Sequence, residues 1–238
     1  MSTSTEQFGW VLHRRPWRES SLLIEFFSHQ QGRVGLVAKG ARSARSSWRG
    51  LAEPFCPLNA NWSRRGEMGT VIELEPAGSR LSLPGRALWC GLYANELILK
   101  LLVRDDPAPE LFHAYTELLS HLAGNQALAP AVRRFELTLL GSLGVAPDFE
   151  HDAFDGKRIR PDGLYHLDPE AGFIPAEQPG PKTYPGDAVL ALAAGARDGH
   201  GRGSDCRRMM RQLIDHHLAG RRLESRRLFE NLTHETEG

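Results

Sequence analysis

The sequence predicts an α+β fold in which a small five-stranded β-barrel is followed by a larger helical domain. Short segments rich in β-branched and aromatic residues occupy most of the first seventy-five positions, and turn-forming residues separate them. After Pro84 and Gly85 the apolar residues recur at helical rather than alternating spacing. We therefore expect one domain over residues 1–80 and a second domain over residues 81–238.

The barrel prediction rests on five segments with the composition of β-strands. Turn formers such as Arg15-Pro16 and Gln31-Gly32 lie between them. Five strands in about seventy residues suit an OB-fold, a small barrel whose closure removes exposed sheet edges. The expected strands are Gln7–His13, Ser21–Ser28, Gly32–Ala38, Pro57–Ser63 and Gly69–Glu75.

The helical prediction rests on apolar periodicity with short links, which favours an antiparallel helical core. Arg86–Val103 is apolar on most sides, so we expect it to be a central helix. Between about residues 147 and 185 the chain is rich in Pro, Gly and Asp, which predicts an irregular excursion, with room for a small hairpin near Gly163. The other expected helices are Glu110–Ala123, Ala131–Leu143, Asp187–Ala196, Ser204–Leu218 and Ser225–Leu232.

Charge is unevenly distributed along the chain although the formal net charge is zero. The net charge is +4 over residues 1–80, −6 over residues 81–196 and +5 over residues 197–227. Such segregation says more about partners than the overall balance does. The sequence contains no run of about 18 apolar residues, its first twenty residues lack the basic start and apolar middle of a signal peptide, and its three cysteines lie far apart. We expect a cytoplasmic protein without membrane segments or a disulfide framework.

The most informative motif is GRVGLVAKGARSARSSWRG, residues 32–50, which contains no acidic residue. Its small residues let the backbone approach phosphate groups, which supply most of the non-specific affinity for DNA. Trp17, Trp48 and Trp62 could stack on bases of a single strand, although each also suits the barrel core. The alternative for the motif is a solvated basic loop. The predicted DNA-binding residues are Arg33, Lys39, Arg42, Arg45 and Arg49.

A pair of arginines interrupts an otherwise apolar predicted helix. Arg133 and Arg134 could hold a hydrophobic peptide tail that ends in a carboxylate. An internal salt bridge with Glu136 or Asp105 is the alternative.

A second basic region near the C-terminus could contact nucleic acid, or it could only solubilise the surface and contact the acidic middle of the chain. It contains Arg207, Arg208, Arg211, Arg221, Arg222, Arg226 and Arg227.

Motifs of nucleotide-dependent and hydrolytic enzymes are absent from the sequence: no GxxxxGK[ST], no GxGxxG after a strand and no GxSxG occurs. We therefore expect no catalytic residues and no cofactor. Acidic and histidine side chains of the excursion could gather a cation, but they lack a fixed ligand spacing. A metal site is not expected there, and a hydrolase built on this region is a minor alternative. These residues are His151, Asp152, Asp155, Asp162, His166 and Asp168.

Several blocks of the sequence match one protein family when they are taken in order. VLHRRPWRESSLLIEFFS and GRVGLVAKGARSARSSWRGLAEPF come first, and GLYANELILKLL and RRFELTLLGSLG follow. GFIP and GRRLESRRLFENL complete the set. Along nearly its whole length the chain thus resembles the bacterial RecO family of recombination mediators and DNA repair proteins. The resemblance implies an N-terminal OB-fold, a helical C-terminal domain, and binding and annealing of single- and double-stranded DNA without a cofactor.

The resemblance also implies partners: the acidic tail of single-stranded-DNA-binding protein (SSB), RecR, and indirectly RecA, which such proteins load on SSB-coated DNA at the nucleoid. Lys39 and Arg42 lie in the family's basic block, and Arg133 and Arg134 lie in the block that borders the SSB-tail pocket. Many relatives carry a four-cysteine zinc site in the excursion, but residues 145–177 contain no cysteine, so zinc is not expected here. An adaptor that docks the SSB tail and binds little DNA is the alternative function.

Overall fold

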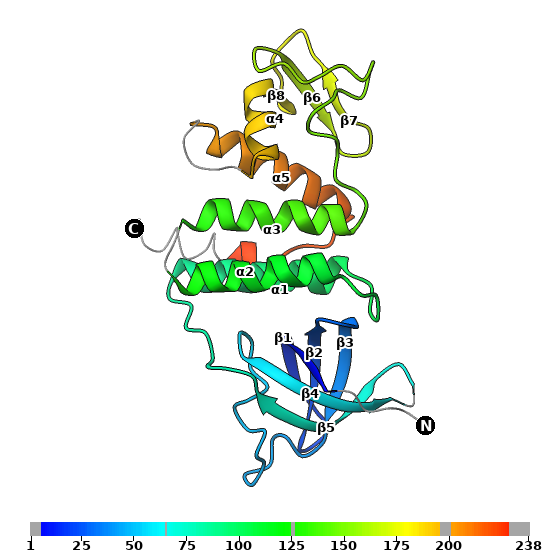
Figure 1. The fold of residues 1–238 in the computed structure, drawn as a ribbon, viewed down its shortest axis with the longest axis vertical. Helices are drawn as coiled ribbons and strands as arrows, with labels where there is room; N and C mark the ends of the chain where they lie inside the picture. The colour runs from blue at the N-terminus through cyan, green and yellow to red at the C-terminus, as the bar shows by residue number, and fades with distance from the viewer. Residues whose placement is uncertain (1–5, 65, 125–126, 196–200, 229–238) are drawn as a thin grey trace. The chain divides into compact units, whose positions relative to one another are not determined.

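The chain forms two compact units. The computed structural model describes residues 6–64, 66–124, 127–195 and 201–228 (Figure 1). One unit comprises residues 1–126 together with residues 223–238, and the other comprises residues 127–222. The domain boundary predicted after residue 80 falls inside the first unit and stays a prediction.

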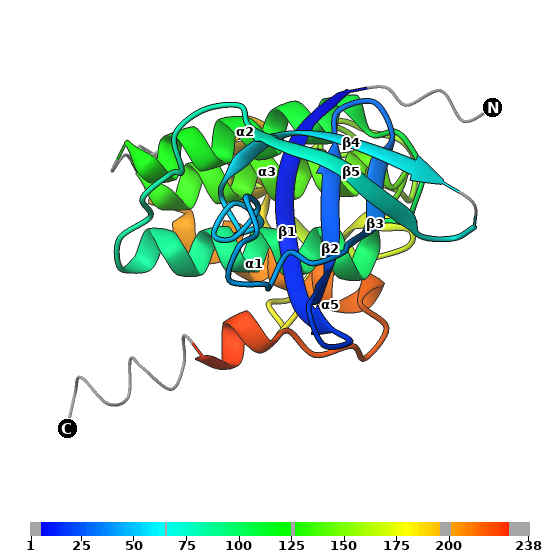
Figure 2. The same cartoon turned by 90° about the horizontal axis from the view of Figure 1, so that it is seen from below.

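Five strands close into a barrel in the order β1-β2-β3-β5-β4, which confirms the predicted OB-type barrel. β3 and β5 run parallel, and every other neighbouring pair is antiparallel. Closure comes from Gln7–Trp10 of β1 pairing with Pro57–Ala60 of β4. Figure 2 shows β1, β2 and β3 side by side, with β4 and β5 crossing them. The strands are β1 Gln7–Trp17, β2 Ser21–Ser28, β3 Gly32–Ala38, β4 Pro57–Arg64 and β5 Gly69–Pro76.

The barrel interior is filled by the inward-facing residues of all five strands. Phe26, Leu36 and Leu58 are fully buried, and Trp62 is 7% exposed and meets Phe26 edge to face at a ring-centroid distance of 6.1 Å. Aliphatic and aromatic burial of this kind stabilises by about 25 cal/mol for each Å² removed from water. Trp62 is therefore a core residue and not a stacking platform. This is the second of the two roles that its sequence context allows.

β1 is longer than predicted. It continues through Arg15 and Pro16 to Trp17, so the expected turn at Arg15-Pro16 is wrong. Beyond Trp10 the described partner of β1 is β2 alone, and proline is tolerated along such a free strand edge. The reversal occurs instead over residues 18–20, where Arg18 takes a positive φ of 52°. Residues 13–17 consequently project as an exposed ribbon.

Two helices of the same unit, α1 Arg86–Leu101 and α2 Pro109–Ala123, contact the barrel through a buried polar network. The Tyr115 hydroxyl donates to Asn95 Oδ1 at 2.6 Å, and Asn95 Nδ2 donates to the Leu12 carbonyl at 2.9 Å. Trp10 Nε1 donates to Thr116 Oγ1 at 3.1 Å. Each polar group that leaves water here finds a partner, which removes the penalty of burying it.

α1 is enclosed on most of its sides. Leu97 and Ile98 are fully buried, and the only exposed side chains of the helix are those of Arg86 and Leu88, the latter 36% exposed. This burial agrees with the central position that the apolar composition of the segment predicts.

The second unit packs three helices and a small sheet. α3 Leu128–Ser142 contacts α5 Gly203–His217, and α5 contacts α4 Gly186–Ala193. The predicted irregular excursion contains an antiparallel sheet in the order β7-β6-β8. Its strands are β6 Leu164–Asp168, β7 Gly172–Pro175 and β8 Thr183–Pro185.

The sheet of the excursion is anchored by α5 and by apolar contacts. Gln212 Nε2 donates to the Leu167 carbonyl at 2.7 Å, and the Tyr184 hydroxyl donates to Gln212 Oε1 at 2.9 Å. Phe173 is fully buried and contacts Phe149 at a ring-centroid distance of 5.6 Å. Aspartates such as Asp168, whose Oδ1 accepts the backbone N–H groups of two following residues, close the turns. The hairpin joins β6 and β7, a few residues after its expected place.

None of the helices in the described ranges combines the length and apolar character that a bilayer span requires. The expected helix Ser225–Leu232 is observed over residues 224–228, and its remaining positions lie outside the described residues.

Candidate nucleic-acid interface

The basic motif forms most of the loop between β3 and β4. Ala41 and Ala52 are each 2% exposed, and Trp48 and Leu51 pack partly buried against the barrel core. The backbone N–H of Arg42 donates to the Ser20 carbonyl at 2.8 Å and attaches the loop to the β1–β2 turn. These anchors hold the loop on the barrel while the residues between them stay outside.

Between its anchors the loop is a series of tight turns. Backbone hydrogen bonds join Ser43 to Gly40, Ser46 to Ser43 and Arg49 to Ser46, each spanning three residues. Small residues and one glycine with a φ of 70° fit such turns without crowding. In this arrangement the basic side chains point outward. The side chains of Lys39, Arg42, Arg45 and Arg49 are all exposed.

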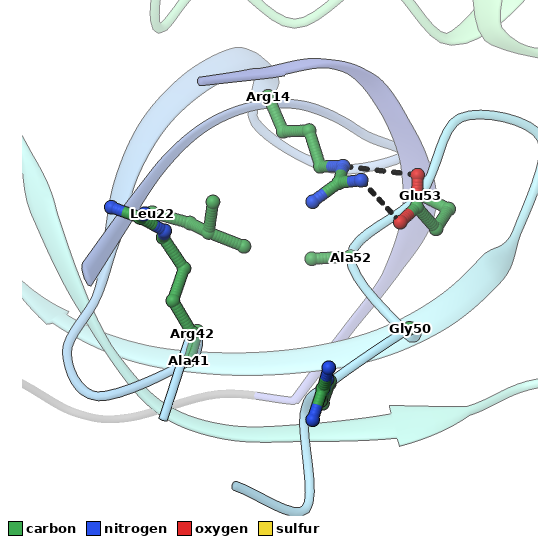
Figure 3. A pocket seen from close by; sticks show the side chains of 8 residues that line it. Arg14, Leu22, Ala41, Arg42, Gly50, Ala52 and Glu53 are labelled. Atoms are coloured by element: carbon green, nitrogen blue, oxygen red, sulfur yellow. Dashed lines mark hydrogen bonds and ion pairs between the residues drawn. The ribbon is translucent and has the colours of Figure 1, made fainter. Parts of the chain in front are cut away.

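A hollow of about 330 Å³ lies between the loop, the exposed part of β1 and the start of β2 (Figure 3). Three arginines and one glutamate supply its charge, and small or aliphatic residues supply the remaining wall. An excess of guanidinium groups around an open hollow is suited to an anion such as a backbone phosphate. The lining residues are Arg14, Leu22, Ala41, Arg42, Arg49, Gly50, Ala52 and Glu53.

Two of the three arginines of the hollow are held in place by the protein itself. Arg14 Nε donates to Glu53 Oε2 at 2.9 Å, and Arg14 Nη2 lies 2.5 Å from Glu53 Oε1 (Figure 3). Arg42 Nη1 donates to the Arg18 carbonyl at 3.3 Å. These contacts determine where the two guanidinium groups lie in the absence of a ligand.

Arg14, Arg15 and Arg18 belong to this surface but were not among the predicted DNA-binding residues. Arg14 and Arg15 are exposed on the ribbon, where Trp17 is 40% exposed, and Arg18 is exposed in the turn that follows. A signal was present, since HRRPWR places three arginines around one tryptophan. That run is separated from the motif by a whole hairpin, and only barrel pairing brings the two together.

Arg33 lies apart from the other predicted DNA-binding residues. Its side chain is 15% exposed, its Nη1 donates to the Leu99 carbonyl, and its Nε lies 3.9 Å from Glu25 Oε2. Its carbonyl accepts the N–H of Asp105 at 2.9 Å. Burial lowers the pKa of the Arg33 guanidinium, which Glu25 opposes. These contacts favour a structural role for Arg33, where β3 meets the α1–α2 connection.

The chain is also closely packed at the turn before Arg33, where only glycine fits. Gly32 has a φ of 67°, and a Cβ there would lie 1.9 Å from the Asp106 carbonyl oxygen. Arg64 adds a bidentate pair with Asp105, at 2.5 and 2.6 Å, which raises the pKa of Arg64. Asp105 thus contacts two barrel strands, through its backbone N–H to Arg33 and through its carboxylate to Arg64.

The arginine pair of α3 has two different environments in the second unit. Arg133 is 15% exposed and forms an ion pair with Glu136, whose side chain is 1% exposed. The Arg134 side chain is exposed, and the Arg134 carbonyl accepts a hydrogen bond from the Thr138 hydroxyl at 3.0 Å. The internal salt bridge thus exists for Arg133 and involves Glu136, and Arg134 presents its charge outward.

Three arginines of the second basic region pair with acids of their own helices. Arg208 lies beside Asp205 at 3.3 Å and stacks on Tyr184 at 4.5 Å, and Arg211 lies 3.8 Å from Asp215. Arg227 lies 2.8 Å from Glu224. The solubilising interpretation is favoured for these residues.

The acidic and histidine residues of the excursion do not converge. Across the part of the chain that the structure describes, no group of three metal-ligand side chains lies together. Asp152 Oδ1 instead accepts the N–H groups of Phe154 and Asp155, each at 2.9 Å. This carboxylate closes a turn of the excursion.

Comparisons with known proteins cover nearly the whole chain and point to one family. Residues 1–80 match the family described as Recombination protein O N terminal, and residues 85–188 match Recombination protein O C terminal. A DNA repair protein RecO from Azoarcus sp. (strain BH72) is 41% identical and covers 95% of this chain and 96% of its own. Those of Methylococcus capsulatus and Pseudomonas aeruginosa PAO1 are 41% and 42% identical, covering 94% and 97% of this chain and 92% and 97% of their own. The chain therefore belongs to the RecO family of DNA recombination and repair proteins.

Proposed function

We propose that this RecO-family chain binds single- and double-stranded DNA through the basic end of its barrel and anneals complementary strands without catalysis. The observation that carries the proposal is the convergence of two separate basic segments, the loop after β3 and the ribbon of β1, around one hollow. Phosphate contacts of exposed Lys and Arg side chains are sequence-independent and salt-sensitive.

The proposed DNA-binding residues are exposed and belong to one end of the barrel. The sequence motif supplies four of them, Lys39, Arg42, Arg45 and Arg49. The fifth is Arg14, which lines the same hollow as Arg42 and Arg49. Arg33 is left out because its guanidinium already contacts Leu99 and Glu25. Trp17 is the proposed stacking side chain because Trp62 lies in the core and Trp48 packs against it.

The test of DNA binding is fluorescence anisotropy of a labelled single-stranded oligonucleotide over a range of salt concentrations. Binding at low salt, with log affinity falling linearly against log salt, is expected. No binding at low salt, or an affinity independent of salt, would overturn the proposal. Annealing is followed with two complementary oligonucleotides coated with SSB, where faster duplex formation is expected with the protein than without it.

We further propose that the second unit docks the acidic SSB tail, with Arg134 as the exposed contact, and that the protein works with RecR to promote RecA loading. The Arg134 side chain is exposed on α3, whereas Arg133 is paired with Glu136. Arg134→Ala should weaken binding of an SSB-tail peptide in a calorimetric titration, with Arg207→Ala as the control. Equal peptide affinity in both variants would remove Arg134 from the site.

The adaptor alternative makes a distinct prediction. If docking of the SSB tail were the whole function, changing Lys39 and Arg45 to glutamine would leave annealing of SSB-coated strands unchanged. The proposal predicts that this variant loses annealing of bare strands while its affinity for the SSB-tail peptide is unchanged.

A further inference from the structure

One acidic side chain occupies the basic hollow. Glu53 places both carboxylate oxygens against the guanidinium of Arg14, with Oε2 accepting from Nε at 2.9 Å and Oε1 lying 2.5 Å from Nη2. Figure 3 shows this pair on one side of the hollow, with Leu22 and Arg42 opposite. A planar guanidinium binds carboxylate and phosphate with the same two-pronged geometry.

The pair is tight but accessible to solvent. The Arg14 side chain is 40% exposed and the Glu53 side chain 21% exposed. Exposed ion pairs contribute little to stability, so their partners exchange at low cost. A phosphate that approaches from solvent can therefore compete with Glu53 for Arg14.

The neighbouring arginines differ from Arg14 in this respect. Neither Arg42 nor Arg49 has an ion pair with a carboxylate within the ranges that the structure describes, and both line the same hollow. One of the three charges is thus neutralised internally, and two face the hollow without an acidic partner. A phosphate in the hollow therefore has two cations without an acidic partner as well as the Arg14–Glu53 pair.

We infer that Glu53 is an internal counter-anion of the DNA site, and that a DNA backbone phosphate displaces its carboxylate from Arg14 on binding. The inference rests on the proposed function, because it describes how the same hollow takes its ligand. Glu53 then lowers the affinity for DNA and makes it less salt-dependent, since the released carboxylate recovers a cation when the phosphate sheds one. It is a residue that sets affinity without contacting DNA.

The test compares Glu53→Gln with Glu73→Gln, using a fluorescently labelled single-stranded oligonucleotide. Glu73 is an exposed residue of β5 outside the hollow, so both variants change the net charge of the barrel equally. Glu53→Gln should bind about two- to five-fold more tightly than Glu73→Gln, the range of one exposed ion pair. Its salt slope should be steeper by about 0.7, the contribution of one further phosphate contact on a single strand.

A double-mutant cycle with Arg14→Gln identifies the target of the carboxylate. In the Arg14→Gln background, the gain from Glu53→Gln should fall to that of Glu73→Gln, because the displaced partner is gone. A gain that persists without Arg14 would overturn the inference and point to general electrostatics. Affinity equal to or below that of Glu73→Gln would also overturn it and leave the pair as a structural tether of the loop.

These outcomes separate this inference from the proposed function. If the unmodified protein fails to bind the oligonucleotide at low salt, the DNA-binding function itself fails. If it binds with the expected salt dependence and Glu53→Gln matches Glu73→Gln, only the counter-anion role fails. A thermal melt of each variant shows whether the fold is retained, and glutamine can keep a hydrogen bond to Arg14 in place of the ion pair.

Discussion

The carboxylate of Glu96, in the middle of α1, holds the start of a helical turn that lies 129 positions later in the chain. Glu96 Oε2 accepts the backbone N–H of Ser225 at 2.9 Å and its hydroxyl at 2.7 Å, and Oε1 accepts the N–H of Glu224 at 2.9 Å. A side chain from another helix thus does the work of an N-cap for residues 224–228. Residues 224 and 225 are joined in this way to α1, in the unit that carries the barrel.

This contact should depend on pH. Burial raises the pKa of Glu96, but hydrogen bonds from Ser225 and Glu224 and the pairing with Lys100 outweigh it, so the pKa is lowered. A group with a lowered folded-state pKa stabilises fully above its unfolded pKa and loses that effect as pH falls through the folded value. The protection of the Ser225 amide, measured against its intrinsic exchange rate at each pH, should therefore fall on acidification below the ordinary carboxyl range, and Glu96→Gln should show little protection at any pH. Glu117→Gln, an exposed residue of α2, is the control, and equal pH profiles for the two variants would contradict this account.

Arg33 should affect stability rather than DNA affinity. Arg33→Gln removes the donor to the Leu99 carbonyl and one of the cations that face Glu25. Leaving such groups without a partner costs about 1–3 kcal/mol, so urea unfolding of the first unit should show a loss in that range. At equal folded concentration, DNA affinity should stay within about two-fold of the unmodified protein, a limit of about 0.4 kcal/mol. A large loss of affinity with unchanged stability would return Arg33 to the DNA-binding surface.

Trp17 should distinguish single strands from duplex DNA. The indole is 40% exposed and adjoins Arg18, whose carbonyl accepts from Arg42 of the basic loop. Stacking on an unpaired base contributes about 1–3 kcal/mol, so Trp17→Ala should weaken single-strand binding by that amount. Duplex binding should change little, and Trp17→Phe should recover part of the loss. Equal losses for single strand and duplex would mean that Trp17 supports the surface without stacking.

Much of the barrel could be predicted because alternation and turn residues are local signals. The predicted strand starts agree with the structure at all five strands, and four of the five ends lie within one residue of the observed ones. The exception is β1, where a proline normally ends a strand. Pro16 lies where β1 has β2 as its described neighbour, an arrangement that depends on where the barrel closes.

The candidate site could be predicted only in part because it joins segments that are distant in the sequence. Lys39 and Arg42 follow from one motif, but the place of Arg14 and Glu53 depends on how β1, β2 and the loop after β3 meet. The engagement of Arg33 depends in the same way on Leu99 of α1. Charge patterning identifies cations but does not show which of them already have partners.

The excursion shows a different limit. Its strands are three to five residues long, too short for alternation to be visible. Their stability comes from contacts such as Gln212 with Leu167, and from turns closed by aspartates such as Asp168. The composition of the excursion alone predicts turns. The pairing of its strands also depends on α5, which carries Gln212 and supports the sheet.

The central claim is that the basic end of the barrel binds DNA through phosphate contacts, and the salt dependence of binding tests it most directly. A variant with Lys39, Arg42, Arg45 and Arg49 changed to glutamine is compared with one of equal charge change made at four exposed residues of the second unit. The control positions are Lys157, Arg160, Lys182 and Arg207. The barrel variant should lose affinity similarly for every single-stranded sequence, and its salt slope should fall by about three, or about 0.7 for each contact removed. The control should keep the slope of the unmodified protein, and equal slopes in the two variants would contradict the account.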